Sequence, residues 1–184
     1  MTRAYVEIET LEVTLNGNPQ ILKIYYLDVT TDRGYRFVLS AHTPDLSGNH
    51  VGKTMICGAP RPICTANPEY MEGGDIKVNK PYFGSGIAKI LIGLSKDMIH
   101  GLGKKLVIRP FRTEEIGGVP TSWDEYPIST VDLRAMYKRN GFREFTPGEI
   151  DDLAIRMKIT DIKSHERSLD FYVTQAKEYL IEES

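Results

Sequence analysis

The sequence predicts a mixed α/β (α+β) domain in which a mostly antiparallel sheet contains one parallel strand pair. Residues 5–42 consist of strand-like runs separated by turn signals, which is the pattern of antiparallel hairpins. Residues 75–109 read as strand, glycine turn, helix and strand, and such a βαβ unit makes its two strands parallel. The 184 residues, 41% of them hydrophobic, are enough for one domain with a sizeable buried core.

The N-terminal strands are predicted from apolar residues that alternate with polar ones and from the turns between them. The run "YVEIETLEV" is followed by the turn "NGNP" and by "QILKIYYLDV". A second turn, "TTDRG" at 30–34, precedes "YRFVLSAH", so two successive antiparallel hairpins fit this region. Residues 43–74 are dense in Gly, Pro and Asn and have no lasting periodicity, which predicts a long irregular loop. Loops of this length inside a compact domain are uncommon and often functional.

A helix that opens with small residues is the most distinctive feature of the chain. "DIKVNK" at 75–80 is a short strand, and "PYFGSGIAKILIGL" then places Gly84, Ser85 and Gly86 before a helix that glycines end near residue 101. "KKLVIRP" follows as the second strand. A glycine turn at a helix start exposes unpaired backbone N–H groups at the positive end of the helix dipole, which favours anion binding. The alternative is that the glycines only shape a tight turn.

A second helix and strand follow in "STVDLRAMYKRNGFREF" at 129–145. Together with "YFGSGIAKILIGL" and "GKKLVIRP", this order of elements resembles the GCN5-related N-acetyltransferase (GNAT) superfamily over residues 75–145. The family signature at the glycine turn is Arg/Gln-x-x-Gly-x-Gly/Ala, which Gly86 and Ala88 match, while Phe83 stands at its first position. The later "MY" and "NGF" match the family pattern of a helix that ends in Leu-Tyr before a Gly-Phe strand.

The resemblance implies a splayed central parallel pair, helices on the faces of the sheet, and acetyl transfer from acetyl-CoA to a primary amine without a metal. The pantetheine arm of acetyl-CoA would pair with the strand backbone around Ile76 and Val78. Tyr137 matches the family tyrosine that protonates the departing thiolate, a role that suits a phenol whose pKa is near 10. The diphosphate would bind at the helix start, on the backbone of Phe83, Gly84, Ser85, Gly86, Ile87 and Ala88.

The sequence also departs from the family pattern. Relatives usually have two helices after the first strand, which build much of the acceptor site, and none is predicted here. An insertion, "FRTEEIGGVPTSWDEYPIS", precedes the Tyr137 helix, and Thr130 stands where relatives often have Asn. The residues leave the general base open. The candidates are Glu72, Asp75, His42, Glu114, Glu115, Asp124 and Glu125, and the alternatives are that they are solvated surface groups and that water mediates the deprotonation. The arginines that could help to hold phosphates are Arg109, Arg112, Arg139 and Arg143.

The C-terminal region is expected to hold one more strand and one more helix. "EIDDLAIRMKIT" alternates apolar and polar residues from Leu153 to Ile159, which predicts a strand antiparallel to "FREF". The tail "SHERSLDFYVTQAKEYLIEE" is predicted as a helix that packs against the domain, with homodimerisation through its apolar face as the alternative. We therefore expect a GNAT-like acyl-CoA-binding domain over residues 1–162 and a helical extension over 163–184.

Composition narrows the function classes. A net charge of −2 and a pI near 6.1 argue against a general nucleic-acid binder, and also against acyl transfer to a nucleobase or tRNA. Cys57 and Cys64 form neither a disulfide framework nor a zinc pattern, so a reduced, cytoplasmic setting is expected. The charged N-terminus is no signal peptide, and no apolar run is long enough to cross a membrane. The competing hypothesis to an enzyme is a non-catalytic GNAT-like binding or assembly module.

Overall fold

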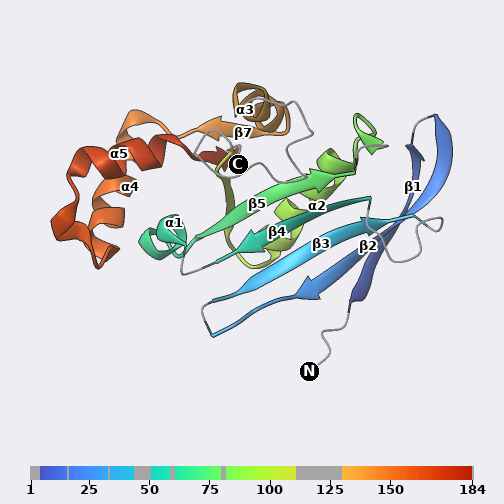
Figure 1. The fold of residues 1–184 in the computed structure, drawn as a ribbon, viewed down its shortest axis with the longest axis horizontal. Helices are drawn as coiled ribbons and strands as arrows, with labels where there is room; N and C mark the ends of the chain where they lie inside the picture. The colour runs from blue at the N-terminus through green and yellow to red at the C-terminus, as the bar shows by residue number, and fades with distance from the viewer. Residues whose placement is uncertain are drawn as a thin grey trace.

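The computed structural model describes residues 5–15, 17–32, 34–43, 51–58, 61–79, 82–110 and 130–183. Within these ranges the strands form one eight-stranded sheet with the order β1-β2-β3-β4-β5-β6-β8-β7 (Figure 1). Every described pair of neighbouring strands is antiparallel except β5 with β6. The predicted fold class, a mostly antiparallel mixed sheet with one parallel pair, is therefore confirmed.

The two predicted N-terminal hairpins are present. Strand β1 (Val6–Leu15) pairs with β2 (Asn18–Asp28), and β2 pairs with β3 (Arg36–His42). The first turn contains Gly17 at a φ of 79°, a left-handed conformation that favours glycine. Leu22, Ile24, Phe37 and Leu39 from these strands are fully buried, so the alternation seen in the sequence does face a core.

The long irregular loop predicted for residues 43–74 is wrong over most of its described part. This region contains β4 (Gly52–Cys57), the short helix α1 (Pro62–Ala66) and the first residues of β5 (Tyr70–Val78). Strand β4 pairs along its whole length with β3. Those hydrogen bonds join distant residues, and they override the Gly- and Pro-rich composition on which the loop prediction was based.

The parallel strand pair is confirmed, but its bounds differ from the prediction. Strand β5 begins at Tyr70 rather than near residue 76 and pairs with β6 (Lys105–Ile108) from Tyr70↔Lys105 to Gly73↔Ile108. The helix expected between the two strands is α2 (Ile87–Gly101). The predicted strand "DIKVNK" is thus the second half of a longer strand.

Helices cover the two faces of the sheet. Helix α2 passes behind β4 and β5 in Figure 1, and its buried Ile87, Leu91 and Ile99 share a core with residues of β2 to β6. On the other face, α1, α4 (Pro147–Thr160) and α5 (Leu169–Lys177) gather near the start of β5 and form a second core with Val107 of β6. The sheet therefore separates two apolar cores.

The strand predicted for "EIDDLAIRMKIT" is wrong, because this segment is helix α4. Thr146 caps the helix through a capping box with Glu149, and Pro147 occupies its first turn. The buried residues Leu153, Ala154 and Met157 follow helical spacing, whereas Ile155 and Ile159 are 48% and 77% exposed. The alternation of period two included these exposed isoleucines, so it did not mark a buried strand face.

The helix predicted for the C-terminal tail is only partly correct, because the last described element is a strand. Helix α5 is confirmed within the predicted tail helix and is preceded by the 3₁₀ turn η3 (Ser164–Glu166). Beyond it, β8 (Leu180–Glu182) lies between β6 and β7 (Phe142–Glu144), antiparallel to both. Strand β8 takes the place expected for "EIDDLAIRMKIT", so residues 180–182 of the predicted extension belong to the same sheet as the preceding strands.

Candidate functional site

The two parallel strands separate at a β-bulge. One residue of β4 lies opposite two residues of β5 between the pairs Ile56↔Gly73 and Thr54↔Ile76. Pairing with β6 ends at Gly73↔Ile108, whereas β5 continues to Val78. Among the described residues, β5 beyond Gly73 pairs with β4 alone. Its other edge can therefore offer N–H and C=O groups to an extended ligand.

Gly73 is required by close packing at the point of separation. A Cβ at this position would overlap Cδ1 of Ile108 and would lie 3.3 Å from Cδ1 of Leu106. Both residues of β6 are buried in the core beneath α2. A side chain at residue 73 would therefore require the side chain of Ile108 to move.

A tight turn carries the chain from the end of β5 into α2. The amide of Asn79 donates to the carbonyl of Val51 at 2.7 Å, and the amide of Ser85 donates to Tyr82 at 3.2 Å. Gly84 and Gly86 have φ values of 74° and 90°, and a Cβ on either would meet no atom within 4 Å. Gly86 is the N-cap of α2 and supplies no side-chain cap. The open backbone at this helix start has the features of an anion site.

The predicted cofactor residues lie together around this turn. Ile76 and Val78 are half-buried and pack against the α2 core, so a ligand on the open edge of β5 would contact their backbone. Ile87, the first residue of α2, is buried. The hydroxyl of Ser85 is buried and has no hydrogen-bond partner among the described residues, so it is one polar group that a ligand at the turn could satisfy.

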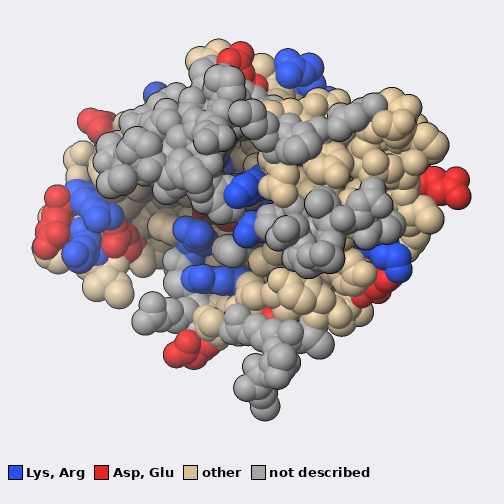
Figure 2. All heavy atoms as spheres, turned by 45° about the vertical axis from the view of Figure 1, so that its right-hand side comes forward, with Lys and Arg blue, Asp and Glu red and all other residues tan. Residues whose placement is uncertain are grey.

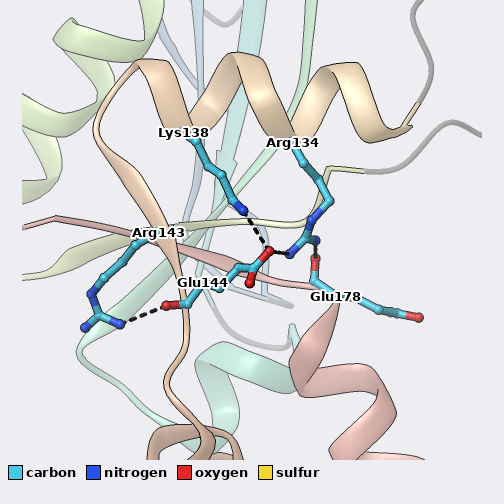
Figure 3. Close-up of polar contacts among 5 residues, drawn as sticks. All are labelled: Arg134, Lys138, Arg143, Glu144 and Glu178. Atoms are coloured by element: carbon cyan, nitrogen blue, oxygen red, sulfur yellow. Dashed lines mark hydrogen bonds and ion pairs between the residues drawn. The ribbon is translucent and has the colours of Figure 1, made fainter.

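Tyr137 lies on α3 (Thr130–Arg139) and is 3% exposed. Its ring packs edge-on against Phe142 of β7, with 5.6 Å between centroids, in the same core as α2. On a neighbouring side of α3, ion pairs join the helix to Glu144 of β7 (Figure 3). There, Arg134 and Lys138 both contact a carboxylate oxygen of Glu144, at 3.3 and 2.9 Å.

Glu72 is a buried carboxylate beside the separation of the strands, on the face away from α2. It is 8% exposed and lies one residue before Gly73. The hydroxyl of Tyr179 donates a hydrogen bond to Glu72 Oε2 at 3.3 Å. Burial raises the pKa of Glu72, and the nearby Arg61 guanidinium opposes this effect only in part. Glu72 was one of seven candidate bases in the sequence. Only the structure distinguishes it from the other six.

The remaining candidates have other positions. His42 contacts the Ser40 hydroxyl at 3.2 Å and packs edge-on against Tyr25. Arg109 donates to Glu178 at 2.9 Å, and Arg143 forms a two-pronged ion pair with Glu149, so neither guanidinium lies at the glycine turn. The side chain of Asp75 and the residues Arg112, Glu114, Glu115, Asp124 and Glu125 lie outside what the structure describes.

Two further observations concern metals and thiols. Cys57 and Cys64 are free and buried, and burial raises the pKa of the Cys64 thiol to about 12. In the described part of the chain, no group of three or more His, Cys, Asp or Glu residues could hold a metal ion. No described helix combines the length and the apolar character needed to span a bilayer.

A small cavity of about 230 Å³ lies at the opposite end of α2. His100, Gly103, Lys104, Lys105 and Glu182 line it. His100 Nε2 is 2.9 Å from Oε1 of the buried Glu182, which also accepts a hydrogen bond from the amide of Leu106. This cavity is at the C-terminal end of the helix and is separate from the glycine turn.

Comparison with known proteins gives a limited result. No protein-family profile and no curated protein sequence matches the chain. Among solved structures, an IAA acetyltransferase from Bacillus cereus ATCC 14579 is similar at 21% identity and a TM-score of 0.38, over 62% of this chain and 58% of that one. A nourseothricin acetyltransferase is similar at 17% identity and a TM-score of 0.38, over 77% and 73% of the two chains. With TM-scores this low, the functional proposal rests on the strand order and the site of this chain.

Proposed function

We propose that this protein is a divergent member of the GNAT superfamily that binds acetyl-CoA and transfers its acetyl group to a primary amine. One observation carries the proposal: β5 has no described partner strand on one edge after Gly73, and the left-handed glycine turn at the start of α2 follows in the sequence. An extended ligand arm and an anionic group attached to it would thus find adjacent binding groups. Acetyl-CoA has this combination in its pantetheine arm and diphosphate.

In the proposed complex, the chain binds acetyl-CoA mainly through its backbone. The pantetheine amides pair with β5 between Ile76 and Val78, in the place that a continuing β6 would otherwise take. The diphosphate accepts hydrogen bonds from the amides between Phe83 and Ala88, at the positive end of the α2 dipole. The small Gly84 and Gly86 let the phosphates approach the backbone closely.

The proposed reaction uses two residues on opposite faces of the sheet. Glu72 accepts a proton from the incoming ammonium, and its raised pKa makes the carboxylate a stronger base than an exposed one. The amine nitrogen then attacks the acetyl carbonyl carbon, a C–N bond forms, and the C–S bond breaks. Tyr137 donates its hydroxyl proton to the departing thiolate, and the proton that the new amide nitrogen loses restores the phenol. The products are an N-acetyl amine and the free thiol of CoA.

A cofactor-binding module without catalysis is the second candidate. The 3% exposure of Tyr137 favours it, because a general acid must reach the leaving thiolate. Phe83, which stands at the first signature position in place of Arg or Gln, also favours the non-catalytic module. Under this reading the scaffold would bind acetyl-CoA and leave the thioester intact.

Thermal unfolding and thiol release together test both candidates. Acetyl-CoA at a hundredfold excess over its dissociation constant should stabilise the folded protein by about 2.7 kcal/mol. Release of free thiol in the presence of a panel of primary amines then separates the enzyme from the binding module. Stabilisation without thiol release supports the module, and absence of stabilisation by acetyl-CoA contradicts both.

A further inference from the structure

Tyr179 lies between α5 and β8 and contacts the proposed base on β5. Its hydroxyl donates to Oε2 of Glu72 at 3.3 Å, and the two residues are 4% and 8% exposed. Among the described residues, no other hydrogen bond to this carboxylate is formed. A buried hydroxyl and a buried carboxylate each need a partner, so this contact satisfies both groups and leaves Oε1 of Glu72 for another one.

Two arginines bind Glu178, the residue before Tyr179. Arg109, just after β6, donates from Nε to the Glu178 carboxylate at 2.9 Å, and its guanidinium carbon lies 5.8 Å from the centroid of the Tyr179 ring. Arg134 of α3 donates to the carbonyl oxygen of Glu178 at 3.0 Å (Figure 3). Arg134 is three residues before Tyr137 on the same helix. The segment that carries Tyr179 is therefore held by contacts from the end of β6 and from the helix of the proposed general acid.

The groups around Glu72 oppose the effect of its burial. In the space-filling view, Lys and Arg side chains gather around a hollow in the middle of the molecule (Figure 2). Burial raises the pKa of Glu72, and the Arg61 guanidinium, the hydrogen bond from Tyr179 and the charge of Arg109 each act to lower it. The other titratable groups beside Glu72 are the thiols of Cys57, its cross-strand partner, and of Cys64, whose pKa burial raises to about 12.

Tyr179 can act on Glu72 only as a hydrogen-bond donor. Burial, and then the charge of Glu72, raise the pKa of the Tyr179 hydroxyl, so this group keeps its proton. A hydrogen bond from a hydroxyl to an ionised carboxylate is stronger than one to a neutral carboxylic acid. The contact therefore favours the form of Glu72 that can accept a proton.

We propose that Tyr179 is a positioning residue for the acetyl transfer: its hydroxyl holds Oε2 of Glu72 and so directs Oε1 to the incoming ammonium. This inference rests on the proposed function. The proton passes from the ammonium nitrogen to Oε1, and Tyr179 keeps its own proton throughout. Tyr179 touches neither the amine nor acetyl-CoA and acts through Glu72. Without the hydroxyl, the carboxylate would lose both its orientation and a hydrogen bond that favours its ionised form.

Tyr179→Phe tests this role without any turnover, and Tyr172→Phe is the matched control. Tyr172 is 1% exposed on α5 and its hydroxyl donates to Asp161 at 2.7 Å, so each change removes one hydroxyl from a carboxylate and keeps the buried ring. The ionisation of Glu72 is followed by ¹³C NMR of its carboxyl carbon, which Glu72→Gln assigns. We expect the titration midpoint of Glu72 to move to higher pH in Tyr179→Phe and to stay unchanged in Tyr172→Phe. An unchanged midpoint in Tyr179→Phe would overturn the inference.

A second pair of variants tests whether Arg134 helps to hold Tyr179. Arg134→Gln and Lys138→Gln each remove one positive charge that contacts Glu144, but of the two side chains Arg134 alone also donates to Glu178. Arg134→Gln should move the midpoint of Glu72 in the same direction as Tyr179→Phe, and Lys138→Gln should leave it unchanged. Equal midpoints in the two variants would contradict the contribution of the Glu178 contact.

The pH–rate profile gives the catalytic readout. Thiol release from acetyl-CoA, with the most active amine of the panel, should be about tenfold slower or more for Tyr179→Phe near neutral pH, since one hydrogen bond to a charged group is lost. The acid limb should move to higher pH while the KM for acetyl-CoA stays unchanged, and Tyr172→Phe should keep the profile of the parent. A loss of rate that is equal at every pH would show a structural tyrosine and would overturn the role.

The two kinds of failure are distinguishable. A parent that releases no thiol with any amine contradicts the proposed function. A parent that releases thiol, together with an unchanged midpoint of Glu72 in Tyr179→Phe, contradicts only the role of Tyr179.

Discussion

Gly52 of β4 lies directly against Ile87, the first residue of α2. A Cβ at Gly52 would be 2.7 Å from Cγ2 of Ile87 and 3.2 Å from the carbonyl oxygen of Lys77. The start of α2, which carries the proposed diphosphate site, can therefore approach the sheet only because residue 52 has no side chain. The position of the cofactor site thus depends on a glycine in a strand that contributes no group to the proposed chemistry.

Replacement of Gly52 by alanine should displace the first turn of α2. Overpacking of a buried site costs about 1–3 kcal/mol, and we expect this loss in the free energy of unfolding measured with urea. Affinity for acetyl-CoA should fall as well. Gly93→Ala is the matched control, because a Cβ there meets no atom within 4 Å and the change should stabilise α2 by about 0.4–1 kcal/mol. Equal stability of the two variants would contradict this account of Gly52.

Gly86→Glu should abolish binding of acetyl-CoA, because it places a carboxylate where the diphosphate is proposed to bind. The φ of 90° at Gly86 also strains any other residue, by roughly 1–2 kcal/mol. Gly86→Ala has the same backbone strain without the charge and is the control. We expect calorimetry to show weakened binding for the alanine variant and none for the glutamate variant. If Gly86→Glu binds acetyl-CoA as the parent does, the anion site is elsewhere.

Tyr137→Phe should separate binding from chemistry. The ring that packs against Phe142 remains, so affinity for acetyl-CoA should stay unchanged. Loss of a positioned general acid should lower the rate of transfer by about 10²–10⁴-fold and remove the alkaline limb of the pH–rate profile. A purely structural tyrosine would instead lose about 1 kcal/mol of stability on substitution, with no selective effect on turnover.

Glu72→Gln tests the proposed base through both rate and stability. The raised pKa of Glu72 means that its protonated form stabilises the folded state at acid pH, and that this contribution disappears as the pH rises through the raised pKa. The variant cannot ionise, so its stability relative to the parent should increase between acid and neutral pH. Turnover should fall by about 10²–10⁴-fold and lose its acid limb. A stability difference that does not change with pH would show that Glu72 keeps an ordinary pKa.

Local patterns in the sequence predicted the elements that local contacts stabilise. Helix α2 has apolar residues at helical spacing between glycines, and the N-terminal hairpins have turn residues between alternating runs. The order of these elements also placed the glycine turn after a strand of the parallel pair, as the structure has it.

Other parts of the fold depend on distant contacts that local patterns do not reveal. Strand β4 forms because β3 and β5 lie on either side of it, and β8 forms because β6 and β7 leave a position between them. The capping box at Thr146 was a local signal for α4 that the alternation around Leu153 obscured. Glu72 could not be preferred as a base from sequence, since its hydrogen-bond partner Tyr179 lies more than a hundred residues further along the chain.

The most direct test of the central claim is to map acetyl-CoA binding on the backbone amides by ¹H–¹⁵N NMR. The account predicts that the largest chemical-shift changes occur in two segments, residues 76–78 of β5 and residues 83–88 at the start of α2, and that Gly86→Glu removes them. Absence of binding, or changes confined to the cavity at His100 and Glu182 at the other end of α2, would contradict it.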